Sequence, residues 1–465
     1  MERVITCQTS QGLKLRASLS RLTRFLATFE VYDPQLVLRQ SEVLGAVEIL
    51  VQEQVVYAGR AVISSLVHTA TGLVCEATLE EGWQDVKGNG LHGNGSPIQA
   101  SFETFWETAR NSFKLLPEFK LAVADLQLAL GNLRLWFEQL ELEQRIGPGL
   151  PAEGQERRLL GELGAPVISL LDDAFERFEA ACERIDEERR PAHRAYVKRL
   201  LHPFVLCAPF MHRTYFKPLG YAGDYEMVNM MTRSPYEGGS LFAKMLNAFF
   251  LNTPPVAAHR NRLELLTQYL LRETCRASLR GRPARILNLG CGPAREIQDF
   301  MAASALADQA QFTLLDFNQE TVQYAQAMLA EARRQHGRKT GIVATKKSAA
   351  QFLVENRRAA AREPYDVIYC AGLFDYLPDH VCRQVLQLFC QLAAPGGLVL
   401  VTNVDSSNPS RHWMEYAVDW HLLHRDGRAL AALAPREARG FEPGRVVAER
   451  SGVNIFLELR KQGHA

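Results

Sequence analysis

A glycine-rich turn is the clearest candidate for chemistry in this chain. The apolar run ARILNL (284–289) leads directly into Gly-Cys-Gly-Pro at 290–293. Glycine lets the backbone adopt left-handed φ and approach a ligand closely. A dinucleotide-binding turn would have a further glycine three positions after Gly292, where this chain has Arg295. The turn therefore predicts a nucleotide-type ligand held close to the backbone and disfavours a pyrophosphate.

Two later apolar runs end in positions that could complete the same site. The run QFTLLD (311–316) ends in Asp316, whose carboxylate can accept hydrogen bonds from both hydroxyls of a ribose. The other interpretation of Asp316 is a helix N-cap, and both roles can hold together. The run YDVIYCAGLFDYL (365–377) ends at the edge of a sheet where ligands of open α/β proteins bind.

The elements that must position these residues alternate regularly after residue 281. Apolar runs typical of strands at 284–289, 311–316, 341–347, 365–372 and 396–404 are separated by stretches with helical periodicity. This alternation predicts a doubly wound parallel sheet with helices on both faces. Two closing runs, RVVAERSG and NIFLELR, predict a terminal antiparallel hairpin.

The rest of the chain divides into three parts by composition. Residues 1–86 carry short alternating runs and predict a small β domain. Residues 87–97 contain four Gly and a Pro and predict a linker. Residues 98–254 have helical periodicity, interrupted at 146–154, and residues 255–465 form the α/β part. We therefore predict a multidomain protein with a Rossmann-like core, a helical region and a small β-barrel-like domain.

Composition restricts the function classes. The chain has 465 residues, with 53 Lys and Arg against 52 Asp and Glu, so no strongly basic face for nucleic acid is indicated. No apolar run reaches the roughly 18 residues of a membrane span, and residues 1–12 lack a signal-peptide core. The nine Cys form no CxxC pair, so no metal site is predicted and the thiols are expected to be reduced and buried. These features predict a cytoplasmic protein without stable membrane insertion.

Residues 284–405 resemble class I methyltransferases that depend on S-adenosylmethionine (SAM), with S-adenosylhomocysteine as the product. The resemblance rests on LNLGCGPAREI, LLDFN, YDVIYCAGLFDYL and LAAPGGLVLVTNV in this order. It implies that the glycine turn contacts the methionine part, that Asp316 holds the ribose, that Phe317 flanks the adenine, and that Lys347 or Ser348 lies at its edge. The residues that the resemblance assigns to the cofactor are Asn288, Gly290, Cys291, Gly292, Asp316, Phe317, Ser348, Cys370, Ala371 and Gly372.

A second resemblance concerns HRTYFKPLGYAGDYEMVN (212–229) and the N-terminal β segment. Both are similar to bacterial proteins of 3-hydroxypalmitic acid methyl ester biosynthesis, which make a quorum-sensing signal and carry a degenerate PilZ-like barrel. A PilZ domain that binds cyclic-di-GMP has an RxxxR and a D/NxSxxG motif. Here Arg21 and Arg24 have a different spacing and the second motif is absent. The resemblance therefore implies a fatty-acid methyl ester synthase without a complete cyclic-di-GMP motif.

The candidates for catalysis lie in two polar segments. Residues 212–229 form either a cover over the cofactor or a structured linker, and Tyr221 and Asp224 are the preferred contacts from it. Residues 404–425 follow a strand end and form either a border of the acceptor pocket or an amphipathic helix on the sheet. From this segment we select Arg411 and His412, with Met414, Tyr416 and Trp420 as the lining of an acyl channel. Arg260 and Arg262 are either a carboxylate clamp or a solvated helix face.

The preferred hypothesis is an O-methyltransferase that forms the methyl ester of a 3-hydroxy fatty acid. Its partner would be a small amphipathic acid, and a homodimer is possible through the long helical segment. A carboxylate acceptor is ionised at neutral pH and needs no general base, whereas an amine or hydroxyl acceptor would need one. Methylation of nucleic-acid bases is disfavoured, because residues 371–374 read Ala-Gly-Leu-Phe and no Pro-Cys pair occurs. The alternatives are an amine or hydroxyl methyltransferase and a SAM-binding regulator without catalysis.

Overall fold

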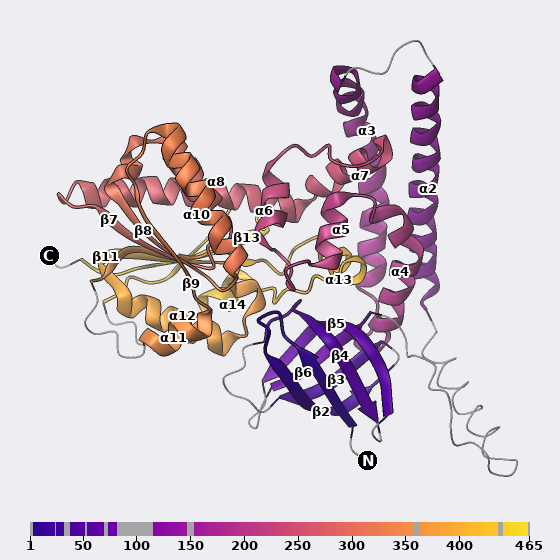
Figure 1. Ribbon diagram of the computed structural model, residues 1–465, viewed down its shortest axis with the longest axis horizontal. Coiled ribbons are helices and arrows are strands. Elements are labelled where there is room, and N and C mark those ends of the chain that lie inside the picture. Colours follow the sequence, from indigo (N-terminus) through magenta and orange to yellow (C-terminus); the bar gives the residue numbers. More distant parts are fainter. Residues whose placement is uncertain are drawn as a thin grey trace, which may run out of the picture.

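The computed structural model describes residues 3–463, except 24, 32–37, 52–53, 69–72, 81–114, 147–152, 357–362 and 436–439. Three parts meet at one place: an N-terminal barrel, a group of helices and a C-terminal α/β sheet (Figure 1). This is the predicted class of architecture. The predicted linker 87–97, the helix expected over 98–114 and Arg24 lie outside the described residues.

The N-terminal part is a closed antiparallel barrel with strand order β1-β2-β3-β6-β5-β4. Its strands are β1 (Arg3–Gln8), β2 (Lys14–Leu22), β3 (Leu26–Val31), β4 (Val43–Val51), β5 (Gln54–His68) and β6 (Leu73–Leu79). Alternate residues along β2 and β3 are buried, which is the period of a strand with one face toward a core. The β domain predicted over 1–86 is therefore confirmed as a closed barrel.

Helices fill the chain between the barrel and the sheet. They are α2 (Pro117–Ile146), α3 (Glu153–Cys182), α4 (Arg190–Val205), α5 (Pro209–Phe216), α6 (Tyr225–Thr232) and α7 (Leu241–Leu251). Helix α7 is buried at nearly every position, so it lies at the centre of this group. Helices α2 and α3 run side by side away from the barrel (Figure 1). Helix α2 ends at Ile146 and α3 begins at Glu153, and residues 147–152 of the predicted interruption lie outside the described residues.

The C-terminal part is a seven-stranded sheet with order β12-β13-β11-β10-β7-β8-β9. The strands are β7 (Ala284–Leu289), β8 (Ala310–Asp316), β9 (Gly341–Lys346), β10 (Tyr365–Cys370), β11 (Ala393–Val404), β12 (Arg445–Ala448) and β13 (Asn454–Arg460). Strands β7 to β11 pair in parallel, while β13 is antiparallel to both β11 and β12. The parallel sheet and the terminal hairpin are both as predicted.

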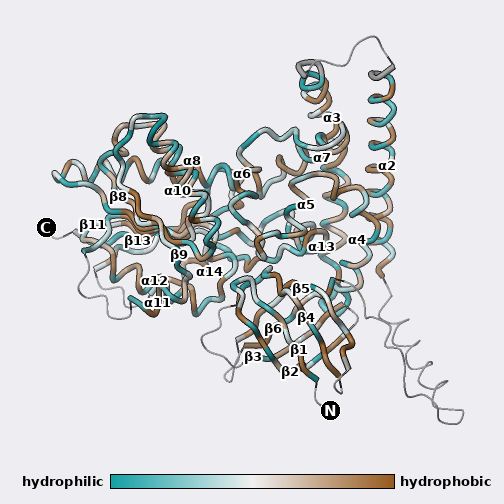
Figure 2. The backbone as a smooth tube through the Cα atoms, viewed as in Figure 1, coloured by the Kyte–Doolittle hydropathy of each residue, from teal (hydrophilic) through white to brown (hydrophobic). Residues whose placement is uncertain are grey.

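Helices cover both faces of this sheet, as the alternation requires. On one face lie α8 (Pro254–Ser278), α9 (Arg295–Ala303) and α10 (Gln319–His336). On the other lie α11 (Ala349–Asn356), α12 (Asp379–Leu392) and α14 (Gly427–Ala431). Successive residues of β10 enter opposite cores, with Val367 toward the first group and Ile368 toward the second. Figure 2 shows the hydrophobic colour concentrated along these strands.

The segment that follows β11 leaves the sheet instead of packing on it. Helix α13 (Arg411–Ala417) inserts Trp413 and Tyr416 into the core of the helical part, where Trp413 stacks on Phe250 with ring centroids 5.6 Å apart. Of the two alternatives considered for 404–425, an amphipathic helix on the sheet does not describe α13. The buried aromatic residues join the segment that follows the sheet to the helices that stand beside it.

The barrel is anchored to both other parts by hydrogen bonds. The Val43 amide donates to the Gly220 carbonyl at 2.7 Å, and the Ser41 hydroxyl donates to the His421 carbonyl at 2.8 Å. The Arg60 guanidinium donates to the Phe216 carbonyl at 2.7 Å. Gly220 and His421 are next in sequence to Tyr221, Trp420 and Leu422, which line the cavity described below, so the barrel is fixed beside that cavity.

Candidate functional site

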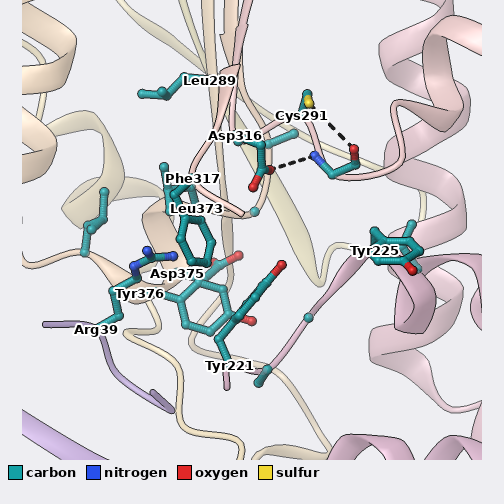
Figure 3. Close-up of a pocket in the computed structure, with 18 of the residues that line it drawn as sticks. Arg39, Tyr221, Tyr225, Leu289, Cys291, Asp316, Phe317, Leu373, Asp375 and Tyr376 are labelled. Atoms are coloured by element: carbon teal, nitrogen blue, oxygen red, sulfur yellow. Dashed lines mark hydrogen bonds between the residues drawn. The ribbon is translucent and has the colours of Figure 1, made fainter. Parts of the chain in front are cut away.

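A cavity of about 360 Å³ lies where the three parts meet. Its walls come from the carboxyl ends of β7, β8 and β10, from α8, from the segment 221–231, from 404–422 and from the barrel. Figure 3 shows side chains from these separate segments turned toward one another. The position at the carboxyl edge of the sheet is the one that the sequence predicted.

The predicted glycine turn forms one wall. Gly290 and Gly292 have φ of 76° and 51°, which residues with a Cβ rarely adopt. The amides of Gly290 and Cys291 both donate to the Leu315 carbonyl, at 2.7 and 3.1 Å, so the turn is tied to the neighbouring strand. A Cβ on Gly292 would meet nothing within 4 Å, so this part of the turn faces open space. The turn therefore leaves room for a ligand against the backbone.

Asp316 ends β8 beside this turn. Its two carboxylate oxygens accept hydrogen bonds from the amides of Gly292 at 3.1 Å and Asn318 at 3.0 Å. A carboxylate has about four lone-pair positions, so both oxygens can accept further bonds. Burial raises the pKa of Asp316, while the two amides act against this. Asn318, and not Asp316, caps α10 by accepting from the Thr321 amide.

Phe317 and Ser348, which were predicted to lie at the adenine end, also line the cavity. Phe317 lies between the Arg39 guanidinium, 3.6 Å from its ring centroid, and the Tyr221 ring, 4.8 Å away between centroids. Ser348 lines the cavity after β9, where its hydroxyl accepts from the Gln351 amide at 3.2 Å. This end of the cavity therefore combines flat surfaces with polar groups (Figure 3).

The turn after β10 contributes backbone to the opposite wall. Ala371 and Gly372 line the cavity, and the Gly372 amide donates to the Thr402 hydroxyl at 3.0 Å. Cys370 is fully buried behind them and is not among the lining residues. Asn288 and Cys291 line the cavity on the β7 side. Of the ten predicted cofactor residues, Cys370 alone lies outside the cavity wall.

A buried arginine stands beside the β10 turn. Arg262 of α8 donates to His259 Nδ1 at 2.6 Å and to Asn454 Oδ1 at 3.3 Å. The guanidinium also lies 3.2 Å from the position of a Cβ on Gly372. Arg262 is only 8% exposed, so the solvated helix face considered for it is wrong. Arg260 points elsewhere and donates to the carbonyls of Met231 and Leu251.

Two further residues of the 374–377 turn face the cavity beside Arg262. Asp375 accepts one hydrogen bond from the Val404 amide at 2.7 Å, and burial raises its pKa to about 6, against the effect of Arg262. The Tyr376 hydroxyl accepts from Trp420 Nε1 at 2.9 Å, which leaves its own proton available for donation. Burial raises the pKa of Tyr376 well above its usual value, so it remains a phenol.

This turn is held by one buried cation. The Arg425 guanidinium donates to the carbonyls of Phe374 and Leu377, to Asn403 Oδ1 and to the Asp379 carboxylate, at 2.7 to 3.0 Å. Such a bridged turn has little freedom to move, because a buried arginine would lose several partners at once. Asp375 and Tyr376 are therefore presented to the cavity in a fixed position.

Beyond these polar groups the cavity wall is largely apolar. Val256, Leu263, Met414, Trp420 and Leu422 form this portion, together with residues of 228–231. Met414 and Trp420 were predicted to line an acyl channel and do line the cavity. Tyr416, predicted with them, is buried in the helical core instead. The cavity thus joins a polar half at the sheet edge to an apolar half under the helices.

The segment 212–229 forms part of the wall, as a cover would. Tyr221 is in the cavity, with its hydroxyl 3.3 Å from the Thr321 hydroxyl. Asp224 is not among the lining residues. It caps α6 by accepting from the Met227 amide at 2.9 Å and pairs with Arg213 Nε at 2.9 Å. The two residues selected from this segment therefore lie in different environments.

We expect Asp224 to act on stability and not on catalysis. Asp224→Ala removes the helix cap and leaves Arg213 without its partner, so the free energy of unfolding should fall by about 1–3 kcal/mol. Asp224→Asn keeps the cap acceptor and should lose less. Denaturation curves and the specific activity of the folded protein test this. A loss of activity in Asp224→Asn at unchanged stability would instead support the catalytic prediction.

Arg411 and His412 lie on α13, outside the cavity wall. Arg411 pairs with Glu415 at 2.9 Å, and the amide of His412 donates to Glu179 at 3.0 Å. Burial lowers the pKa of His412. Glu179 accepts from two successive amides of α13, so these contacts attach the helix to α3. The structure therefore separates Arg411 and His412 from the cofactor residues.

Among the cavity residues that were not anticipated from the sequence, three bear on the chemistry: Arg39, Asp375 and Tyr376. Asp375 and Tyr376 lie within the recognised run after β10 but were passed over in favour of the polar segments. Their place directly after a strand end was the available signal. Arg39 comes from the barrel, and its approach to Phe317 has no signal in local sequence spacing. Within the described residues, no cluster of His, Cys, Asp or Glu suited to a metal ion is found.

No described helix is long and apolar enough to cross a membrane. Comparison with known proteins shows where the chain has relatives. Residues 282–438 match the family model for a methyltransferase domain. The ubiquinone biosynthesis O-methyltransferases of Yersinia pestis (strain Pestoides F) and Yersinia pseudotuberculosis (strain IP 31758) are each 29% identical to it over 139 residues, which is 30% of this chain. The chain spans about half the length of these curated relatives, 49% in both cases.

Solved structures are similar at low identity. A possible exported protein from Bordetella parapertussis has a TM-score of 0.42 at 20% identity, covering 54% of this chain and 86% of that protein. A magnesium protoporphyrin IX methyltransferase from Synechocystis, solved with S-adenosylhomocysteine, has a TM-score of 0.36 at 13% identity, covering 54% of this chain and 98% of that protein.

Proposed function

We propose that the chain is an O-methyltransferase that uses SAM and acts on a small amphipathic acid, with the methyltransferase domain matched over residues 282–438 as its catalytic part. A 3-hydroxy fatty acid, converted to its methyl ester, is the acceptor we favour. The observation that carries the proposal is the single cavity that joins the glycine turn and Asp316 to an apolar compartment. The cofactor and a hydrophobic acceptor could then share one enclosed space.

The residues present fit the cofactor. The turn at Gly290 and Gly292 is open on the cavity side, and Asp316 retains lone pairs for a ribose diol. Arg262 lies beside the β10 turn, on the side that the resemblance assigns to the methionine part, where a guanidinium suits a carboxylate. When bound, SAM supplies a methyl group on a positively charged sulfur.

The chain's own residues would orient the acceptor for in-line transfer. Methyl transfer needs the attacking oxygen held against the methyl group, so catalysis depends mainly on positioning. The Tyr376 proton is free to donate to one acceptor oxygen, because Tyr376 already accepts from Trp420. The apolar portion of the wall, which includes Val256, Leu263, Met414, Trp420 and Leu422, would bury the alkyl part of the acceptor and exclude water. A carboxylate acceptor needs nothing more, since it is already ionised.

The test is methyl transfer by the purified full-length chain from methyl-labelled SAM to a series of 3-hydroxy fatty acids. We expect label that extracts into organic solvent and is released as methanol by base, because methyl esters hydrolyse and methyl ethers do not. Extractable label that resists base would overturn the ester and indicate an ether. SAM binding without transfer to any acid would overturn the fatty-acid proposal and favour a SAM-binding regulator.

One observation favours a second candidate, a hydroxyl or amine acceptor. Asp375 faces the cavity with a pKa of about 6, raised by burial, which is suited to a general base near neutral pH. The curated relatives carry the name of O-methyltransferases in ubiquinone biosynthesis, which supports oxygen as the acceptor atom without choosing between hydroxyl and carboxylate. The two candidates differ in whether Asp375 must accept a proton.

The pH dependence of Asp375→Asn separates them. If Asp375 is the base, activity of the wild type requires its ionised form, so kcat/KM should rise with pH to a plateau above about pH 6. Asp375→Asn should then lose that rise and fall about a hundred-fold, at the low end of general-base effects. For a carboxylate acceptor we expect no such fall, because Asn keeps the contact with the Val404 amide. The measurement is a pH–rate profile of both proteins.

A further inference from the structure

We propose that Arg39 of the N-terminal barrel is a cofactor-binding residue that contacts the adenosine part of SAM. Its guanidinium lies 3.6 Å from the Phe317 ring centroid and lines the cavity, although Arg39 is far from the methyltransferase domain in sequence. Figure 3 shows it facing Phe317 and Tyr221. The barrel would then be part of the active site and not an appended module. This inference uses the cofactor of the domain and is independent of the acceptor.

Arg39 is held in place by its own segment. Its amide donates to Glu42 Oε2 at 3.0 Å, while Oε1 of the same carboxylate accepts from the Ser10 hydroxyl at 2.6 Å. Two residues further along, Ser41 has φ of 59° and exchanges hydrogen bonds with the backbone of His421. The segment 39–43 is thus fixed to the wall of the cavity. The backbone that carries Arg39 is therefore held by Glu42 on the barrel side and, through Ser41, by His421 on the cavity side.

Most of the Arg39 side chain is covered, but it borders the cavity. Arg39 is 8% exposed, and none of its guanidinium nitrogens is a fully buried atom without a partner, so these nitrogens are not sealed away from the cavity. A guanidinium has five N–H donors and a flat face. A ligand in the cavity that brings acceptor atoms and an aromatic plane would use both. Adenosine provides both, through its ring nitrogens, its ribose oxygens and its aromatic plane.

The location favours the adenosine part over the acceptor. Arg39 borders Phe317, which directly follows Asp316, and both were assigned to the adenosine end. The charged residue at the other end is Arg262, beside the β10 turn. A guanidinium can stack on an aromatic base as well as on Phe317, and such contacts gain from the absence of water. Arg39 and Arg262 therefore serve opposite ends of the same cofactor.

The experiment compares two ligands by calorimetry on full-length protein. S-adenosylhomocysteine contains both ends, whereas 5′-methylthioadenosine lacks the amino-acid end. We expect Arg39→Ala to weaken both ligands by about the same factor, roughly ten-fold for a desolvated cation–π contact. Arg39→Lys keeps the charge without the planar stack and should recover part of the affinity. The matched control is Arg60→Ala, which removes barrel contacts to Phe216 and Glu80 outside the cavity.

The outcomes are distinct. Equal weakening of both ligands in Arg39→Ala, with Arg60→Ala near the wild type, supports the proposal. Unchanged or tighter binding in Arg39→Ala overturns it, as does an equal loss in Arg60→Ala, which would show that any loosening of the barrel has the same effect. Weakening of S-adenosylhomocysteine alone would move Arg39 to the amino-acid end and also overturn it. A wild type that binds neither ligand would contradict the cofactor assignment itself.

Discussion

Replacing Asp316 by alanine should weaken SAM binding by about a thousand-fold. Two hydrogen bonds from ribose hydroxyls to a buried carboxylate would be lost, each worth about 1.5–3 kcal/mol when the acceptor is charged. The same change removes the acceptor for the Gly292 amide, so the glycine turn would lose one of its ties to β8. Calorimetric titration of S-adenosylhomocysteine into the wild type and the variant measures the effect.

Asp316→Asn is the matched control for this prediction. Asparagine keeps a similar volume and one acceptor oxygen, but its NH2 group replaces the oxygen that accepts from the amide of either Gly292 or Asn318. We expect an intermediate loss of affinity and a thermal midpoint between those of the wild type and Asp316→Ala. Equal affinity in all three proteins would show that Asp316 only organises the turn and does not hold the ligand.

The second large effect is expected at the other end of the cavity. Arg262→Met should weaken S-adenosylhomocysteine by several hundred-fold, because a bidentate contact from a buried guanidinium to a carboxylate would be lost. Binding of 5′-methylthioadenosine, which has no carboxylate, should change little. Methionine fills similar space without a charge, so folding should be retained even though His259 and Asn454 lose a donor. The ratio of the two dissociation constants is the measurement.

Arg260→Met provides the comparison on the same helix. Arg260 is only two positions away, but it donates to the carbonyls of Met231 and Leu251 and does not line the cavity. The substitution should leave both ligands bound as in the wild type, apart from a modest loss of stability. If Arg262→Met weakened both ligands equally, Arg262 would support the cavity wall and would not contact the amino-acid end.

The fold could be predicted where local periodicity is strong. The β runs of 284–404 and the hairpin of β12 and β13 follow from alternation of apolar runs, because a sheet buried on both faces needs them. The course of α13 could not be predicted in the same way. Trp413 and Tyr416 have helical spacing suited to a sheet face, but their partners are Phe250 and Phe178, which are distant in sequence. Periodicity identifies an apolar face without naming its neighbour.

The residues of the cofactor site could be predicted from the sequence better than the residues chosen for catalysis. Nine of the ten residues assigned to the cofactor line one cavity, since strand ends at one edge of a sheet must converge. The residues chosen for catalysis came from segments rich in polar side chains, yet Asp224 and Arg411 are paired with Arg213 and Glu415 instead. Polarity alone does not separate an ion pair that fixes a helix from a group that faces a ligand. Arg39 lies in the cavity although no local sequence pattern indicates it, because it reaches Phe317 only through the position of the barrel.

A crystal structure of the full-length chain with S-adenosylhomocysteine would show directly whether the cofactor and the acceptor compartment share one cavity. We expect the ribose on Asp316, the amino-acid carboxylate at Arg262, the adenine beside Phe317 and in contact with the Arg39 guanidinium, and the sulfur facing Tyr376 and the apolar compartment. Density for the ligand elsewhere, or with its sulfur directed away from that compartment, would contradict the claim that cofactor and acceptor share this cavity.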